Sequence, residues 1–174
     1  MKLSLVVPCY NEEGNVEKFF NEVNKVFCGK VSDYEFVFVN DGSKDKTYQK
    51  LKQLYNNNHN EFSIQVLTFS RNFGKEAAMY AGLSKAVGDL VCIIDADLQQ
   101  RPEVVLEMLD VMNSDEELDC VAAYQQRRKE SAMLSAFKSG FYKLINRISD
   151  VDFVNGASDF RLMKRPMVDA ILQM

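Results

Sequence analysis

Histidine and closely spaced cysteines are almost absent from this 174-residue sequence. The single histidine, His59, lies in the polar run 56–60, which is typical of a loop. The four cysteines show neither Cys-x-x-Cys spacing nor a neighbouring histidine, so we do not expect a structural zinc site. We interpret Cys9, Cys92 and Cys120 as small apolar core residues in a reducing compartment.

Long hydrophobic runs are also missing. No segment approaches the roughly 18 apolar residues that a membrane-spanning helix needs. At the amino terminus a short apolar run ends at Pro8 and is followed by Glu12 and Glu13, which is too little for a signal peptide. We therefore expect this chain to be soluble, with the cytoplasm as its compartment.

Positive charge is not in excess, and two glycine-rich motifs are lacking. The formal net charge is -4, which argues against nucleic acid as a partner. The first predicted strand is followed by 8–14 (PCYNEEG), not by Gly-x-Gly-x-x-Gly, and no P-loop occurs. A dinucleotide-dependent dehydrogenase and a P-loop nucleotidase are therefore not expected.

The residues that are present fit one packed α/β domain. The composition is 47% hydrophobic, with 12 Phe and 7 Tyr, which is enough for a core. Predicted strands alternate with predicted helices, an order typical of a mostly parallel twisted sheet with helices on both faces. The predicted strands are 3–7, 35–39, 64–69, 90–94 and 119–124, and the predicted helices are 16–27, 45–55, 74–87 and 102–112, with Asp45 as a helix cap.

The pattern changes after residue 124. Residues 125–131 are a charged stretch that predicts a loop, and 134–148 have one strongly apolar helical face. That face favours a core-facing helix, and a helix on a membrane surface stays open. A last helix opens at Pro166 and has no stop signal before Met174, so we expect a domain truncated at its carboxyl end, with a ligand-binding part over 1–124 and the start of a second part over 125–174.

Two carboxylates, Asp95 and Asp97, stand one residue apart at the end of the apolar run 90–94. In an extended segment residues two apart point the same way, so the two side chains can converge. Carboxylate oxygens suit Mg²⁺ or Mn²⁺, which commonly take further ligands from substrate phosphates. A solvated turn is the alternative interpretation of this spacing.

Four polar clusters follow predicted strands, at 8–11, 40–43, 70–72 and 95–97. In a parallel sheet, ligands bind beyond the carboxyl ends of the strands. We therefore expect these clusters to meet at one edge of the sheet and to form the binding site there.

Five ordered motifs, at 7–13, 39–43, 71–75, 95–99 and 159–162, resemble those of the family 2 inverting glycosyltransferases. The likeness is strongest to the polyprenyl-phosphate glycosyltransferases, the group of bactoprenol glucosyltransferase and dolichol-phosphate mannose synthase. This resemblance spans nearly the whole chain. It implies a GT-A fold, a nucleotide-sugar donor such as UDP-glucose, a lipid-phosphate acceptor, and a divalent ion, Mg²⁺ or Mn²⁺.

The resemblance also implies roles for individual residues. Asp41 would accept hydrogen bonds from the uracil edge, and the metal would be held by Asp97 with help from Gln99, while Asp95 faces the ribose or the ion. The other residues implied to surround the nucleotide-sugar are Pro8, Tyr10, Glu12, Arg71, Asn72 and Ala96.

For the acceptor, the matching carboxylate is Asp159, which with Asp97 is the implied catalytic pair; a helix or turn cap is the alternative interpretation of Asp159. Arg127, or its neighbours Arg128 and Lys129, and Arg161 would bind the acceptor phosphate, because guanidinium groups fit phosphate oxygens. Relatives carry further membrane-associated segments, so we expect the full-length protein at the cytoplasmic face of the cell membrane, and a homo-oligomer stays open.

Two alternatives to transfer onto a lipid phosphate remain. One is a family 2 transferase that acts on a sugar hydroxyl in polysaccharide or glycan synthesis, for which Asp159 must be a true base. The other is a nucleotide-binding domain without turnover.

Overall fold

The structure is a computed structural model that describes residues 1–124 and 157–174. The chain divides into two compact units, residues 1–122 with 159–174, and residues 123–158. The predicted loop 125–131, the predicted helix 134–148 and Arg127 with its neighbours Arg128 and Lys129 lie outside the described residues.

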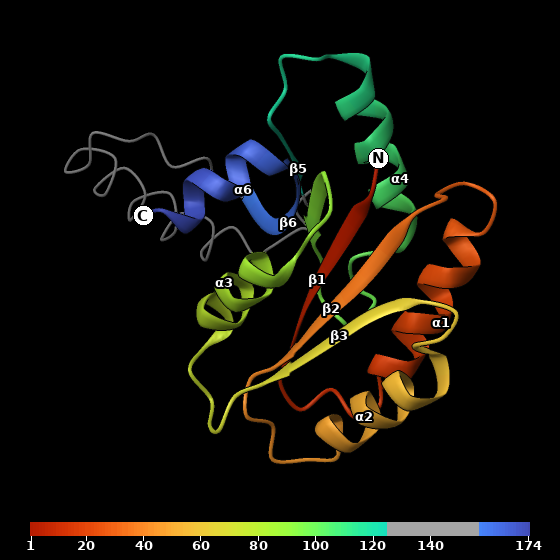
Figure 1. Cartoon of the computed structure of the whole chain (residues 1–174), viewed down its shortest axis with the longest axis vertical. Helices are drawn as coiled ribbons and strands as arrows, with labels where there is room; N and C mark the ends of the chain where they lie inside the picture. The colour runs from red at the N-terminus through yellow and green to blue at the C-terminus, as the bar shows by residue number, and fades with distance from the viewer. Residues whose placement is uncertain (125–156) are drawn as a thin grey trace, which may run out of the picture. The chain divides into compact units, whose positions relative to one another are not determined.

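Six strands form one sheet in the order β3-β2-β1-β4-β6-β5 (Figure 1). β1 pairs in parallel with β2 and β4, β2 pairs in parallel with β3, and β6 runs antiparallel to β4. The predicted α/β class with a mostly parallel sheet is confirmed, and β6 is an addition, since no strand was predicted there. The strands are β1 (Leu3–Cys9), β2 (Tyr34–Asn40), β3 (Ser63–Thr68), β4 (Leu90–Ile93), β5 (Cys120–Tyr124) and β6 (Ala157–Lys164).

Helices cover both faces of this sheet. In Figure 1, α1, α2 and α4 lie on one face, and α3 and α6 lie on the other. Within residues 1–124 and 157–174, no helix has the length and apolar character that crossing a membrane requires. The helices are α1 (Val16–Phe27), α2 (Thr47–Asn58), α3 (Lys75–Lys85), α4 (Pro102–Ser114) and α6 (Arg165–Leu172).

Four of these helices differ from their predicted bounds by one to three residues at an end, and only α1 has the bounds expected. α2 begins at Thr47, and Asp45 is not its cap residue, although its carboxylate accepts a hydrogen bond from the Thr47 backbone N–H at 2.9 Å. α6 ends at Leu172, where we expected it to continue to Met174; the backbone N–H of Gln173 donates to the carbonyls of Ala170 and Ile171.

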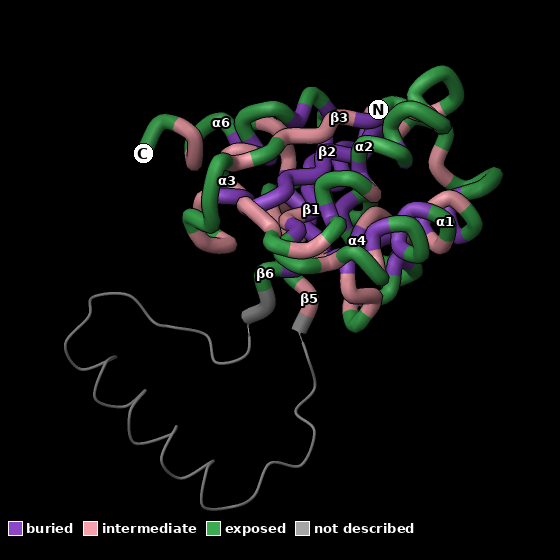
Figure 2. Tube along the Cα trace, turned by 90° about the horizontal axis from the view of Figure 1, so that it is seen from below, coloured by how far each residue is buried: buried purple, intermediate pink, exposed green. Residues whose placement is uncertain are grey.

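Aromatic side chains fill the core between α1 and the sheet. Phe19 and Phe20 are buried on α1, where the three- and four-residue spacing of apolar side chains predicted the helix. The Phe19 ring meets Phe38 edge to face at 6.3 Å between centroids, and Phe20 lies 4.9 Å from Phe36. Figure 2 shows the buried residues concentrated along β1 and β2 between the helices.

On the opposite face α3 approaches the sheet closely. A Cβ atom added at Gly82 would lie 2.3 Å from Cγ1 of Val6 and 3.3 Å from Cγ2 of Val39. Only a residue without a side chain fits there, so the glycine sets the distance between α3 and the sheet. This fixes where the first turn of α3 stands at the carboxyl edge of the strands.

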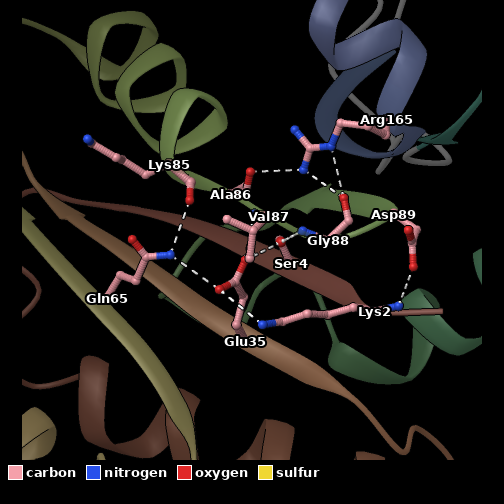
Figure 3. Close-up of polar contacts among 10 residues, drawn as sticks. All are labelled: Lys2, Ser4, Glu35, Gln65, Lys85, Ala86, Val87, Gly88, Asp89 and Arg165. Atoms are coloured by element: carbon pink, nitrogen blue, oxygen red, sulfur yellow. Dashed lines mark hydrogen bonds and ion pairs between the residues drawn. The ribbon is translucent and has the colours of Figure 1, made fainter.

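A buried carboxylate, Glu35, organises the amino edge of the sheet (Figure 3). Its Oε1 accepts hydrogen bonds from the Ser4 hydroxyl at 2.5 Å and the Val87 backbone N–H at 2.8 Å. Its Oε2 accepts one from Gln65 at 3.2 Å and lies 3.7 Å from Nζ of Lys2. A buried charge is tolerated only with such partners, so Glu35 links β1, β2 and β3 to the loop before β4.

The same loop is held from the other side by Arg165, the first residue of α6. Its guanidinium donates to the carbonyls of Ala86, at 2.9 Å, and Gly88, at 2.6 and 3.0 Å, and its backbone N–H donates to the carbonyl of Asp89 (Figure 3). The carboxyl end of β6 is therefore anchored to the loop that leads into β4.

Candidate functional site

A cavity of about 400 Å³ opens at the carboxyl edge of the strands, as the polar clusters in the sequence predicted. Four lining residues were not in the predicted set, and these are Cys9, Gly74, Lys75 and Ala78. Eight predicted site residues line it together: Pro8, Tyr10, Glu12, Asp41, Asn72, Asp95, Ala96 and Asp97.

The loops after β1 and β2 are joined by backbone-to-side-chain hydrogen bonds. The Asn11 backbone N–H donates to the Ser43 hydroxyl at 3.0 Å, and the Asn11 side-chain oxygen accepts from the Lys44 backbone at 2.9 Å. The Glu12 backbone donates to Thr47 at 2.7 Å. Asn11 is in the left-handed region, with φ of 58°, a conformation that asparagine tolerates. These bonds fix the side of the cavity on which Tyr10 and Glu12 stand.

Asp41 is almost fully buried, and both of its carboxylate oxygens accept backbone hydrogen bonds. The donors are the N–H groups of Phe73 at 2.7 Å and Gly74 at 3.0 Å. Next to it, Gly42 has φ of 59°, and a Cβ there would lie 2.1 Å from the carbonyl carbon of Arg71. Asp41 and Gly42 thus hold the loop 71–74 against β2, and a contact of Asp41 with a base stays a prediction.

Within the described part of the chain, four predicted site residues do not line the cavity: Arg71, Gln99, Asp159 and Arg161. The Arg71 guanidinium carbon lies 4.8 Å from the centre of the Phe73 ring, a cation–π arrangement. Gln99 is exposed, and its backbone N–H donates to Oδ1 of Asp97 at 3.0 Å. The roles of Arg71 and Gln99 toward nucleotide and metal stay predictions.

The loop 94–100 carries Asp95 and Asp97 and forms a turn, whereas an extended segment was predicted. Gln100 closes the loop, because its side chain accepts from the Asp95 backbone at 2.9 Å and donates to Oδ2 of Asp95 at 3.0 Å. Leu98 has φ of 61°, which is uncommon for a bulky residue and is kept only where the surroundings impose it. The turn nevertheless places both carboxylates on the cavity wall.

Lys75 joins two of the predicted carboxylates. Its Nζ lies 2.8 Å from Oδ1 of Asp95 and 3.3 Å from Oδ2 of Asp159. The antiparallel ladder of β4 and β6 ends at the pair Ile93 and Arg161, and Asp95 and Asp159 each lie two residues beyond this pair. Two like charges facing each other across strands repel, so a cation between them stabilises the arrangement.

Sequence reasoning gave Lys75 no role, although it stood inside one of the motifs. One signal was available: Lys75 is the first residue of α3, and a cation at a helix amino terminus is disfavoured by the helix dipole. Burial lowers the pKa of Lys75, but hydrogen bonds and attraction from Asp95 and Asp159 outweigh it, and the net pKa is raised. Lys75 is therefore a permanent cation in the cavity.

The thiol of Cys9 belongs to a residue of the cavity wall that is buried. Burial raises its pKa far above the usual range, and the nearby charges of Glu12 and Asp95 raise it further. Burial alone has the same effect on the pKa of Cys92. A raised pKa lowers the reactivity of a thiol, and the burial of both residues agrees with the core role predicted for them.

Asp159 lies in β6, so its interpretation as a helix or turn cap is wrong. Its side chain is 49% exposed, which leaves it open to a ligand beside Lys75. Arg161 stands two residues further along β6, opposite Ile93, and so lies on the same face of the sheet as Asp159. Arg127 cannot be compared, since it is outside the described residues.

The carboxylates suit a divalent ion only with help from a ligand. Within the described part of the chain, no three Asp, Glu, His or Cys side chains group so that they could hold a metal. Asp95 is engaged by Lys75 and Gln100, which leaves Asp97 as the carboxylate with free acceptor capacity. One carboxylate plus phosphate oxygens and waters is a common environment for Mg²⁺, so the residues fit a metal that arrives with a diphosphate.

Comparison with known proteins agrees with this geometry. A relative from Synechocystis, described as an uncharacterized glycosyltransferase, is 41% identical over 175 residues, which cover 100% of this chain and 54% of that protein. The bactoprenol glucosyl transferase of Shigella phage SfV is 37% identical over 171 residues, 98% of this chain and 54% of that protein. The chain thus spans about half the length of the curated relatives it matches.

Among solved structures, the glucosyl-3-phosphoglycerate synthase of Mycobacterium tuberculosis, in complex with Mn²⁺, UDP and phosphoglyceric acid, superposes with a TM-score of 0.66. The two sequences are 19% identical, and the match covers 95% of this chain and 56% of that one. At this identity the likeness concerns the fold, and it defines the present α/β architecture as a GT-A glycosyltransferase fold.

The family is established by sequence. Residues 4–172 match the family described as "Glycosyl transferase family 2". This chain belongs to that family, as the resemblance of its five motifs to those of the family had indicated.

Proposed function

We propose that this domain transfers a hexose from UDP-glucose, or a related UDP-sugar, to a polyprenyl phosphate, with inversion at the anomeric carbon. The observation that carries the proposal is that Asp95 and Asp97 line one cavity, with Asp159 joined to Asp95 through Lys75. The lipid acceptor is suggested by the name of the relatives called bactoprenol glucosyl transferase.

Different residues of the cavity wall would bind different parts of the nucleotide-sugar. Tyr10 and Glu12 would shape the pocket for base and ribose, with Pro8 beside them, and Asn72 and Ala96 would line the path of the diphosphate. Asp41 would set the position of the loop 71–74, through its two backbone hydrogen bonds, whether or not it also meets the base.

In the transfer step, an acceptor oxygen attacks the anomeric carbon from the face opposite the nucleotide, the bond from that carbon to the diphosphate oxygen breaks, and UDP leaves. A bound Mg²⁺ or Mn²⁺ would neutralise charge on the departing diphosphate. Asp97, with Asp95 next to it, would face that diphosphate. Asp159 would stand at the acceptor side, with Arg161 and Arg127 proposed to bind the acceptor phosphate.

A phosphate acceptor is already an anion, so it needs a strong base less than a sugar hydroxyl does. The need for a base therefore distinguishes the proposed phosphate acceptor from the alternative, a sugar hydroxyl. The membrane surface, which would present the lipid at its cytoplasmic face, would be contacted through parts of the full-length protein other than the described residues.

Two measurements test the proposal. Calorimetric titration of the chain with UDP, with and without Mn²⁺, should give tighter binding when the metal is present, and an unchanged affinity contradicts the role of Asp97. Transfer from UDP-glucose to polyprenyl phosphate by the full-length protein should survive Asp159→Asn in substantial part. A loss of about 100-fold or more would instead favour a hydroxyl acceptor that depends on a general base. UDP binding without any transfer would favour a binding domain.

A further inference from the structure

Lys75 places a positive charge where a metal ion would otherwise compete for Asp95. Its Nζ contacts both oxygens of that carboxylate, at 2.8 and 2.9 Å. The Lys75 side chain is 39% exposed, so it is held by these contacts and not by burial in a core. In the structure, Asp95 is therefore already neutralised by the protein itself.

The remaining capacity of Asp95 is also reduced by the protein. The Gln100 amide donates to Oδ2 at 3.0 Å, so this oxygen meets two donors of the same chain. Asp97 differs, because the only contact found for its carboxylate among the described residues is the Gln99 backbone N–H. The pair of carboxylates thus offers a cation one free group rather than two.

Resting on the proposed function, we propose that Lys75 is an internal counter-ion that makes metal binding depend on the nucleotide. Without a nucleotide, the ammonium group holds Asp95 and repels a divalent ion from the cavity. A nucleoside diphosphate brings oxygen ligands and about two or more negative charges, which offset the ammonium charge and complete the coordination that Asp97 begins.

The same ammonium group also ties the metal side of the cavity to the acceptor side. Nζ lies 3.3 Å from Asp159, which comes from β6, while Asp95 follows β4. Lys75 is thus a positioning residue for the two carboxylates, and any change in its charge is felt by both.

The test is to titrate the full chain with Mn²⁺ alone and with Mn²⁺ in the presence of UDP, following free Mn²⁺ by electron paramagnetic resonance. Lys75→Met should bind Mn²⁺ without UDP about tenfold more tightly than the unaltered chain, because one charge within a few Å commonly shifts an ionic equilibrium by that factor. The gain in Mn²⁺ affinity on adding UDP should shrink accordingly.

Two variants separate charge from packing. Lys75→Arg keeps the cation and should retain the weak binding of Mn²⁺ alone. Lys85→Met removes a lysine at the other end of the same helix and should leave the Mn²⁺ affinity unchanged. Circular dichroism and a melting curve for each variant verify that it is folded, as expected for a half-exposed position.

The outcomes distinguish the two proposals. If the unaltered chain binds neither UDP nor Mn²⁺, the proposed function is contradicted. If it binds both, but folded Lys75→Met binds Mn²⁺ alone no more tightly than the unaltered chain, the counter-ion role of Lys75 is overturned while the proposed function stands.

Discussion

The two edges of the same sheet each hold a contact between lysine and carboxylate, and they use it differently. At the amino edge, the Glu35 side chain is 1% exposed and is met by Lys2 together with three hydrogen-bond donors. At the carboxyl edge, Asp95 and Asp159 are 27% and 49% exposed, and a single lysine serves both.

The difference follows from the cost of burying charge. A carboxylate without water must have its hydrogen bonds supplied by the protein, and once they are supplied it has nothing left for a ligand. A half-exposed carboxylate keeps contact with water and can exchange it for a ligand. The amino edge is therefore suited to holding strands together, and the carboxyl edge to chemistry.

The largest effect is expected for Asp97→Asn. Removing this charge should lower transfer by the full-length protein about a thousandfold, since stabilising a leaving diphosphate through a metal contributes several kcal/mol. The melting temperature should hardly change, because Asp97 is partly exposed and bonded only within its loop among the described residues. Asp110→Asn, an exposed carboxylate on α4, serves as the control in both assays. A marked drop in melting temperature together with the loss of transfer would contradict the functional difference proposed between the two edges of the sheet.

The opposite pattern is expected for Glu35→Ala. The truncation leaves the Ser4 hydroxyl and the Val87 N–H without their acceptor and the Lys2 ammonium without its carboxylate, which should cost about 3 kcal/mol of unfolding free energy. Urea denaturation measures this loss. The UDP affinity of the folded fraction should stay within about twofold of that of the unaltered chain, because mutations at distant sites usually have nearly independent effects. The control is Glu61→Ala, an exposed glutamate. Weakened UDP binding with unchanged stability would contradict the assignment of Glu35 to the stability of the fold.

A smaller effect on both properties is expected for Gly42→Ala, because this residue joins fold and site. A Cβ at φ of 59° and 2.1 Å from the Arg71 carbonyl carbon forces the loop 71–74 away from Asp41. We expect a loss of about 1–2 kcal/mol in stability and a weaker UDP affinity, measured by denaturation and calorimetry. Gly14→Ala is the matched control, since no atom lies within 4 Å of its added Cβ. Equal behaviour of the two variants would show that the loop adapts.

The fold was predictable where local pattern and tertiary burial coincide. α1 has the bounds 16–27 that its apolar spacing predicted, and β1 to β5 agree with the predicted strands to within two residues at each end. β6 escaped prediction although Asp159 and Arg161 alternate with the buried Phe160 and Leu162, a short pattern typical of a half-buried strand. Its strand conformation depends on pairing with β4, more than 60 residues away in sequence, which no local window contains.

The acidic residues of the site were predictable from the sequence, but its lysine was not. Asp95 and Asp97 follow a strand that local pattern predicted, and the parallel sheet brought the other polar clusters to them. Lys75 was overlooked because its partners lie 20 residues away at Asp95 and farther still at Asp159, so the sequence around it looks like an ordinary solvated helix start.

The anchoring of β6 by Arg165 couples two distant parts of the molecule. The position of Asp159 is set from the far end of its strand, where Arg165 donates to Ala86 and Gly88, and by the ladder with β4. A disturbance of the loop 86–89, at the amino edge of the sheet, is therefore transmitted along β6 to a carboxylate that contacts Lys75 at the opposite edge.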